Sequence, residues 1–192
     1  YSISVTDIIP CPATIANVTI TEASAMTPTI SGNDVKCPGL CNGTSTVTVT
    51  GGLQPYTFNW SDGQSSSNQS AGTIISGLCA GPYDVTITDT LGCTVTESII
   101  IEEPLPIAFT AAIVDPTCNG GCNGSITLTT PTGGFSPYSY QWSTIPAQTN
   151  ITATGLCGQV SYSVTVSDLN LCNEIETYVL NQSVVLETNV IV

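Results

Sequence analysis

The sequence predicts an all-β protein made of tandem β-sandwich repeats of about 80 residues. The first sign is internal similarity. Gly77–Cys93 reads Gly-Leu-Cys-Ala-Gly-Pro-Tyr-Asp-Val-Thr-Ile-Thr-Asp-Thr-Leu-Gly-Cys, Gly155–Cys172 repeats the pattern, and its second half fills Tyr1–Cys11. Similarity at a fixed period indicates a repeat architecture. The second sign is that β-branched residues, punctuated by Gly and Pro, show no 3.6-residue apolar period, which favours a β-sandwich.

The repeat divides the chain into four segments. Residues 1–22 are the C-terminal part of a truncated repeat, and residues 23–103 and 104–182 are two complete β-sandwich repeats. Residues 183–192 match the first strand of a following truncated repeat. Because the chain opens and closes within a repeat, we expect it to be a window of a longer protein.

Alternating and aromatic segments predict the strands of the first complete repeat. Thr46–Thr50 alternates threonine with valine, the period-2 pattern of a half-buried strand. Tyr56–Trp60 places its three aromatic residues on one face of a strand. Ser61–Gly72 is polar, so we expect a loop or a short edge strand. The other expected strands are Thr27–Val35, one that begins at Thr73, Tyr83–Asp89 and Thr94–Ile101.

The second complete repeat follows the same order, and we expect six or seven strands per repeat in two packed sheets. Its expected strands include Ile126–Thr130, Tyr138–Trp142 and one that begins at Tyr162. Trp60 and Trp142 take the place of a core tryptophan on the third strand, and Tyr83 and Tyr162 that of a tyrosine corner. Aromatic side chains can also stack on sugars, but their single-face placement favours core packing. These residues are Tyr56, Phe58, Trp60, Tyr138, Tyr140 and Trp142.

Composition excludes several classes of function. The 192 residues include 14 carboxylates, one cation (Lys36) and no histidine, so the formal net charge is −13. Nucleic acid is excluded as a partner because phosphate binding requires Lys and Arg. We expect no membrane insertion, because no apolar run of 18 residues occurs. Without histidine, serine and cysteine lack their usual activating base, so we expect no enzyme.

Nine cysteines at repeating positions indicate an oxidising compartment and a disulfide-stabilised fold. Zinc binding by Cys37-x-x-x-Cys41 and Cys118-x-x-x-Cys122 is the competing interpretation, which the absence of histidine disfavours. The strand after Cys79 separates it from Cys93 by about 23 Å at ~3.3 Å per residue. That separation is too long for a disulfide between these two cysteines.

Two sets of disulfides remain for each repeat. One set is Cys37–Cys93 with Cys41–Cys79, and the other is Cys37–Cys79 with Cys41–Cys93. We prefer the first set, which corresponds in the second repeat to Cys118–Cys172 with Cys122–Cys157. Cys37 and Cys41 can lie at most about 14 Å apart, so this set only just reaches, and a bond from Cys93 to a neighbouring repeat stays open. Cys11 is equivalent to Cys93, so its partner is expected upstream of Tyr1.

Three motifs together resemble the SprB repeat of giant cell-surface adhesins of Bacteroidetes, which include gliding-motility adhesins. They stand at Cys118–Ser125 (Cys-Asn-Gly-Gly-Cys-Asn-Gly-Ser), Gly51–Ser61 (Gly-Gly-x-x-Pro-Tyr-x-Phe-x-Trp-Ser) and Gly77–Cys93. The second copy departs from the pattern at Gly158–Ser161 and at Leu171, which alters turns only. The resemblance implies an Ig-like or PKD-like sandwich, type IX secretion and a place on the cell surface. It implies no catalytic residues.

We therefore expect structural stalk or spacer repeats of a large secreted adhesin or surface filament, involved in adhesion or gliding motility. The alternatives are a carbohydrate- or surface-binding module and a self-assembling filament subunit completed by strand exchange. The expected partners are neighbouring repeats of the same long chain, with a polysaccharide or a solid surface as further candidates. Protease mapping and binding to polysaccharides separate these hypotheses.

We expect no cofactor, although structural calcium is a candidate because aspartate oxygens lie near turns. The candidate ligands are Asp62, Asp84, Asp89 and Asp168. Asp89-Thr90-Leu91 resembles the O-glycosylation signal of Bacteroidetes, which makes Thr90 a glycosylation candidate. Glu102 and Glu103 adjoin a proline at a repeat boundary and are expected to form a solvated hinge.

Overall fold

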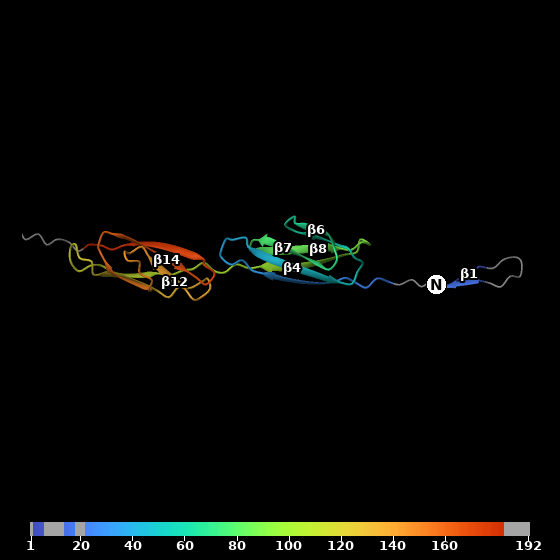
Figure 1. Ribbon diagram of the computed structural model, residues 1–192, viewed down its shortest axis with the longest axis horizontal. Coiled ribbons are helices and arrows are strands. Elements are labelled where there is room, and N and C mark those ends of the chain that lie inside the picture. The colour runs from blue at the N-terminus through green and yellow to red at the C-terminus, as the bar shows by residue number, and fades with distance from the viewer. Residues whose placement is uncertain (1, 6–13, 18–21, 183–192) are drawn as a thin grey trace, which may run out of the picture. The chain divides into compact units, whose positions relative to one another are not determined.

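The computed structural model describes residues 2–5, 14–17 and 22–182, and these residues form strands, turns and loops but no helix (Figure 1). β1 (Ser2–Val5) and β2 (Thr14–Asn17) form an antiparallel pair, within the part of the chain assigned to a truncated repeat. No membrane-spanning helix occurs in this described part. The strand expected in residues 183–192 lies outside the described residues.

The first complete repeat has seven strands in two sheets (Figure 1). One sheet has the order β3-β4-β7 and the other the order β6-β5-β8-β9. The bounds are β3 (Thr27–Asn33), β4 (Gly43–Thr50), β5 (Tyr56–Trp60), β6 (Ser65–Gln69), β7 (Gly72–Leu78), β8 (Gly81–Thr88) and β9 (Thr94–Ile101). The segment expected to be a loop or a short edge strand is therefore the edge strand β6.

Period-2 alternation explains these strands. In β4, Ser45, Val47 and Val49 are buried while the intervening threonines face outward. The aromatic residues of β5 form part of the core: Phe58 is fully buried, and its ring meets that of Tyr56 edge-on with centroids 6.4 Å apart. Core packing of this aromatic strand is confirmed, and it removes these rings from any contact with sugars.

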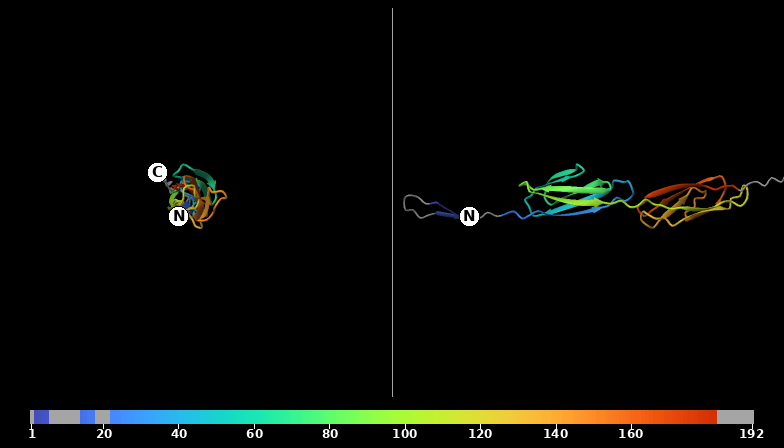
Figure 2. Two further views of the ribbon diagram at one scale, coloured as in Figure 1. Left: turned by 90° about the vertical axis from the view of Figure 1, so that its left-hand side faces the viewer. Right: turned by 180° about the vertical axis from the view of Figure 1, so that it is seen from behind.

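The second complete repeat has six strands, again in two sheets (Figure 2). The sheet orders are β10-β11-β13 and β12-β14-β15. The bounds are β10 (Ala111–Val114), β11 (Gly124–Leu128), β12 (Ser139–Trp142), β13 (Thr152–Leu156), β14 (Ser161–Ser167) and β15 (Asn173–Val179). Its core draws on both sheets, with Ile126 and Leu128 from β11, Trp142 from β12, and Val164 and Val166 from β14. The expected all-β sandwich is confirmed.

Two details match immunoglobulin-like sandwiches. Trp142 is buried on the third described strand of its repeat, and its indole N–H donates to the carbonyl of Asn150 (2.9 Å). The hydroxyl of Tyr162 accepts a hydrogen bond from the backbone N–H of Cys157 (2.8 Å), five residues upstream, as a tyrosine corner does. Tyr138 and Tyr140 are half-buried and pack against the same core.

The described chain forms two compact units, which do not coincide with the repeats. The first contains Tyr1–Ser31, Ser45–Ile75 and Tyr83–Ile99. The second contains Gly32–Thr44, Ser76–Pro82 and Ile100–Val192. The second unit thus joins two cysteine-bearing loops of the first repeat with the whole second repeat. The division into complete repeats at residues 23–103 and 104–182 therefore stays a prediction.

Candidate functional site

The Gly51-Gly52 turn is one half of a corner that closes one end of the first sandwich. Gly51 has φ +75°, and an added Cβ would lie 2.1 Å from the carbonyl oxygen of Ala25, so only glycine fits here. Gly52 donates its N–H to the carbonyl of Ser24 (2.7 Å). The hydroxyl of Tyr56 donates to the carbonyl of Gly51. The motif Gly-Gly-x-x-Pro-Tyr is therefore one hydrogen-bonded turn.

Asp89 is the other half of this corner. Its Oδ1 accepts from the N–H groups of Leu91 and Cys93 (both 2.9 Å), and its Oδ2 accepts from the N–H of Leu53 (3.1 Å). Burial of the carboxyl raises its pKa, but the amide donors of Cys93, Leu53 and Leu91 outweigh burial, so the pKa of Asp89 lies below its ordinary value. The carboxylate thus ties the Cys93 turn to the glycine turn. We call residues 51–56 with 89–93 the glycine end of the repeat.

The second repeat builds the same corner. Asp168 Oδ1 accepts from the N–H groups of Asn170 (2.8 Å) and Cys172 (2.9 Å), and Oδ2 accepts from Phe135 (2.9 Å). The hydroxyl of Tyr138 donates to the carbonyl of Gly133. The glycine end of the second repeat is therefore residues 133–138 with 168–172.

Opposite this corner lies a loop whose asparagine and glycine explain the motif Cys-x-x-x-Cys-Asn-Gly. The side-chain oxygen of Asn42 accepts from the N–H of Lys36 (3.0 Å) and closes the loop. A Cβ on Gly43 would lie 2.8 Å from the Ile101 side chain and 3.0 Å from the carbonyl of Leu78. Asn123 accepts from the N–H of Thr117 (3.1 Å) in the second repeat. We call residues 37–43 with 79, and residues 118–124 with 157, the cysteine ends.

The two ends of the first repeat are far apart because β4 runs from one to the other. β4 begins at Gly43, beside Cys41, and stops at Thr50, beside the glycine turn. Its length is about 23 Å at ~3.3 Å per residue. Cys37 belongs to the cysteine end and Cys93 to the glycine end, whereas bonded cysteines have Cα atoms roughly 4.4–6.8 Å apart. The structure has no bond between these two cysteines, because Cys37 is bonded to Cys172 and Cys93 is a free thiol.

The disulfides of the structure follow this geometry. Cys41–Cys79 and Cys122–Cys157, the pairs of the preferred set that stay within a cysteine end, are present. The other expected pairs, Cys37–Cys93 and Cys118–Cys172, are wrong. Instead, Cys37 of the first repeat is bonded to Cys172 of the second, with Cα atoms 5.5 Å apart and a sequence separation of 135. Cys93 and Cys118 are exposed free thiols.

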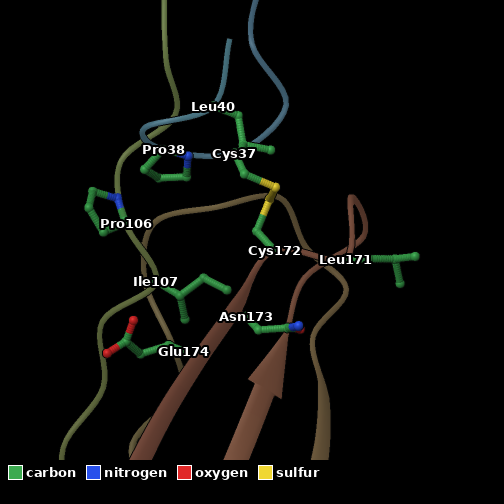
Figure 3. A pocket seen from close by; sticks show the side chains of 9 residues that line it. All are labelled: Cys37, Pro38, Leu40, Pro106, Ile107, Leu171, Cys172, Asn173 and Glu174. Atoms are coloured by element: carbon green, nitrogen blue, oxygen red, sulfur yellow. A yellow bond between two sulfur atoms is a disulfide. The ribbon is translucent and has the colours of Figure 1, made fainter. Parts of the chain in front are cut away.

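The Cys37–Cys172 bond lies in a pocket of about 330 Å³ inside the second compact unit (Figure 3). Leu171 points away from the sulfur atoms in this view. The carbonyl oxygen of Lys36 lies 3.1 Å from Cys172 Sγ and accepts from the side-chain amide of Asn170 (3.4 Å). The lining residues are Cys37, Pro38, Leu40, Pro106, Ile107, Leu171, Cys172, Asn173 and Glu174. The bond is thus surrounded by apolar and polar contacts between 36–40 and 170–174.

The acidic pair at the repeat boundary is fixed in place rather than hinged. The N–H of Glu102 donates to Asp34 Oδ1 (2.8 Å), and its carbonyl accepts from the N–H of Val35 (3.1 Å). Glu103 Oε2 accepts from the N–H of Gly39 (2.9 Å). Glu102 and Glu103 are exposed to solvent, as expected, but the expected hinge is wrong, because three hydrogen bonds hold this segment to the loop that carries Cys37.

The candidate calcium ligands are engaged with the protein itself. The carboxylate of Asp62 accepts from the backbone and side-chain N–H groups of Gln64 (2.9 and 2.7 Å). Asp84 Oδ1 accepts from the hydroxyl of Ser98 (2.6 Å). Within the described residues, no three His, Cys, Asp or Glu side chains form a group that could hold a metal ion. Structural calcium therefore stays a prediction without a site in this part of the chain.

Thr90, the glycosylation candidate, is exposed but its hydroxyl is occupied. Its Oγ1 donates to the carbonyl of Leu53 (2.7 Å) or Gln54 (3.0 Å), so it strengthens the glycine end. A sugar at Oγ1 would replace the proton that makes these bonds. Modification of Thr90 stays a prediction, and it would cost the corner one hydrogen bond.

A search of curated proteins found no match. Among solved structures, the chain is similar to the three N-terminal domains of the highly immunogenic outer capsid protein of bacteriophage RB49, with 20% identity over 82% of this chain and 59% of that one, and a TM-score of 0.43. It is also similar to a C-terminal fragment of intimin in complex with the intimin-binding domain of its translocated receptor, with 15% identity over 84% and 64% and a TM-score of 0.37.

A two-domain fibronectin type III segment of chicken tenascin is similar at 14% identity over 83% of this chain and 99% of that one, with a TM-score of 0.28. The chain thus spans less than two thirds of the first two structures. The model of the SprB repeat family matches residues 29–65 and 110–147, which begin within β3 and at the residue before β10 and end beyond the aromatic strands β5 and β12. The chain thus carries a match to the SprB repeat at the equivalent place in each complete repeat, which is consistent with a protein of the SprB-repeat family.

Proposed function

We propose that these repeats are spacers in the stalk of a large secreted cell-surface adhesin or surface filament, exported by type IX secretion and involved in adhesion or gliding motility. SprB repeats and disulfides are features of an extracellular, adhesin-type repeat module. The chain's net charge of −13 and its lack of histidine fit a structural role better than a catalytic one. The expected partners are neighbouring copies of the repeat.

The observation that carries this proposal is the Cys37–Cys172 bond between the two repeats. Tension applied to the two ends of the chain passes through this bond, which bypasses 135 residues of sequence. The load therefore does not have to be carried by hydrogen bonds of the sheets. A covalent bypass has a clear use in a module that transmits force along a stalk, and none in a site that binds a small ligand.

The alternatives receive less support. A sugar-binding module needs a surface of exposed aromatic rings, but Tyr56, Phe58 and Trp60 are at most 4% exposed and Trp142 is 1% exposed. Among the exposed large hydrophobic residues of the described chain, Phe135 is the one aromatic ring, and it is 48% exposed. A subunit completed by strand exchange needs a gap in one of its sheets. In residues 27–179, each sheet is built only from strands of its own repeat.

Binding of the folded, oxidised chain to a panel of polysaccharides and to bare glass tests the proposal. A spacer shows no saturable binding to any of these surfaces, whereas an adhesive module shows a saturable isotherm. The matched control is the same chain with its disulfides reduced and alkylated, since unfolded chain reports the non-specific background. Saturable binding by the oxidised chain alone would overturn the spacer role and direct attention to the loops of the glycine ends.

A further inference from the structure

The two free thiols of the described residues are repeat equivalents of the two cysteines that are bonded between repeats. Cys93 in the first repeat corresponds to Cys172 in the second, and Cys118 in the second corresponds to Cys37 in the first. Cys37 and Cys172 form the inter-repeat disulfide, while Cys93 and Cys118 are exposed and unbonded. One inter-repeat disulfide is therefore present, and each of the two repeats also has one unpaired cysteine at a position equivalent to a partner in that disulfide.

The local geometry at the free thiols is the same as at the bonded ones. The N–H of Cys93 donates to Asp89 Oδ1 over 2.9 Å, and the N–H of Cys172 donates to Asp168 Oδ1 over 2.9 Å. The carbonyl of Cys93 accepts from the N–H of Asp89 (3.0 Å), and the same bond closes the Cys172 turn at 3.0 Å. The carboxylate corner therefore presents Cys93 in the conformation that Cys172 has when it is bonded.

The cysteine ends agree in the same way. The carbonyl of Cys37 accepts from the N–H of Leu40 (3.2 Å), and the carbonyl of Cys118 accepts from the N–H of Gly121 (2.9 Å). Both loops are closed by an asparagine at the equivalent position and tied by a disulfide at their second cysteine. Neither thiol needs a new backbone conformation to form the bond that Cys37 forms.

We propose that Cys93 and Cys118 are head-to-tail attachment sites for further copies of this repeat. Cys118 bonds the glycine-end cysteine of the copy that follows, and Cys93 bonds the cysteine-end cysteine of the copy that precedes. Repetition of this bond gives a continuous disulfide ladder along the array. The inference rests on the proposed function only in that further copies stand beside this pair.

Formation of each bond requires an oxidant, which a small-molecule or protein disulfide supplies. With glutathione disulfide, one protein thiol first forms a mixed disulfide and releases one glutathione. The thiolate of Cys118 then attacks the Cys93 sulfur of that mixed disulfide: the Cys118–Cys93 bond forms, the bond to glutathione breaks, and the leaving glutathione takes a proton. Two protein thiols are oxidised, and one glutathione disulfide becomes two molecules of glutathione.

The ladder sets how far an array can stretch. Within one copy, the covalent path from Cys93 runs back to Cys79, across the disulfide to Cys41 and on to Cys37, about 18 residue steps in all. At ~3.5 Å per step this path extends to about 60 Å. An unlinked repeat of about 80 residues extends to about 280 Å on the same scale. The ladder therefore limits the extension of each copy to roughly a quarter of that of an unlinked repeat.

The test asks whether separate chains choose this bond. All variants carry Cys11→Ser, which removes a cysteine outside the described residues. A ¹⁵N-labelled C93S chain, which offers Cys118, is mixed in equal amounts with an unlabelled C118S chain, which offers Cys93, at about 100 µM in a glutathione redox buffer. After quenching with iodoacetamide, intact mass spectrometry without reduction separates the mixed-label dimer from the two same-label dimers. Digestion at acidic residues then identifies the linked peptides, because the single Lys36 gives trypsin almost no site.

We expect the mixed-label dimer to exceed the sum of the same-label dimers at least fivefold, with Cys93 linked to Cys118. The statistical proportion, in which mixed and same-label dimers are equal, or the absence of a dimer would overturn the proposal. The matched control is a C118S chain in which Cys93 is also replaced by serine and Ser67 by cysteine, so that its free thiol lies at position 67. Ser67 is exposed on β6 and is not equivalent to either cysteine of the Cys37–Cys172 bond. This control should give only the statistical proportion. Saturable binding to polysaccharide alongside this linkage would remove the spacer role but leave the ladder intact.

Discussion

The Cys37–Cys172 bond predicts a large and measurable limit on how far this chain extends under force. Between residues 22 and 182 lie 160 residue steps, of which the bond bypasses 135. About 25 steps remain in the force path, which extend to about 90 Å at ~3.5 Å per step. The fully reduced chain extends over all 160 steps to about 560 Å. Oxidation should therefore hide more than four fifths of the contour length.

Removal of the inter-repeat bond alone gives an intermediate value. In C37S/C172S, the two remaining disulfides bypass 38 and 35 residues, so about 87 steps lie in the force path. These extend to about 300 Å, which is about 220 Å more than the fully oxidised chain. Cys11, Cys93 and Cys118 are replaced by serine in all chains so that free thiols cannot exchange with the disulfides. The oxidised parent, the oxidised C37S/C172S chain and the reduced parent then give three lengths that depend only on connectivity.

The assay is single-molecule force spectroscopy with a handle at each end of the chain, first in buffer and then with dithiothreitol. The segments outside residues 22–182 add the same length to every variant, so the differences of about 220 Å and about 255 Å carry the result. Equal lengths for the oxidised parent and C37S/C172S would refute the reasoning, because Cys37 and Cys172 would then not bypass the sandwiches. After reduction, both chains should reach the same length of about 560 Å, because neither then has a disulfide.

Three further predictions concern the ends of the repeats. C41A/C79A should lower the free energy of unfolding in urea by about 3–4 kcal/mol, the chain entropy of the 38-residue loop; an unchanged midpoint would contradict it. Gly133→Ala should destabilise the fold by well over the roughly 1 kcal/mol expected for Gly120→Ala. Both glycines have φ above +70°, but only a Cβ at position 133 would meet a carbonyl oxygen, at 2.0 Å. Equal shifts of the melting temperature in the two variants would contradict the argument from this close contact. The lowered pKa of Asp89 predicts stability that is fully present above its ordinary pKa and is lost as pH falls through the lowered value, so D89N should flatten the acid limb of stability against pH. A parallel acid limb in D89N would assign that loss to other carboxyls.

The strands could be predicted from the sequence because each of them obeys a local rule. Valine alternates with threonine along β4, and the three aromatic residues of β5 share one face, so side-chain period alone identifies a half-buried strand. Boundaries were accurate where the alternation reached the turn, as in β9, which runs from Thr94 to Ile101 as expected. The sequence does not decide between a loop and an edge strand for β6, because its serines and asparagine carry no apolar period, and only pairing with β5 makes it a strand.

The disulfide pairing could not be predicted because it depends on which end of the sandwich each cysteine occupies. The strand between Cys79 and Cys93 already implied that these two lie at opposite ends. The length of β4 implies in the same way that Cys37 lies at the same end of the sandwich as Cys79, and at the opposite end from Cys93. What sequence cannot supply is the packing of 36–40 against 170–174, which brings Cys37 to Cys172. The contacts of the Asp89 carboxylate could not be predicted for a related reason: its amide donors include Leu53, 36 residues away.

The residues of the family motif that are not simple strand formers lie at the two ends of each repeat. The Gly-Gly turn, its tyrosine and the aspartate form the glycine end, while the cysteines, asparagine and glycine form the cysteine end. In an enzyme, polar residues of a motif converge on one pocket, and in a lectin they surround a ligand surface. Here they stabilise the two ends of each sandwich, and the middle of each sandwich needs only alternation of apolar and polar residues. A sequence pattern that specifies the ends and leaves the faces free is what the proposed array of spacers requires, because the function of such an array depends on the junctions between copies and not on any single face.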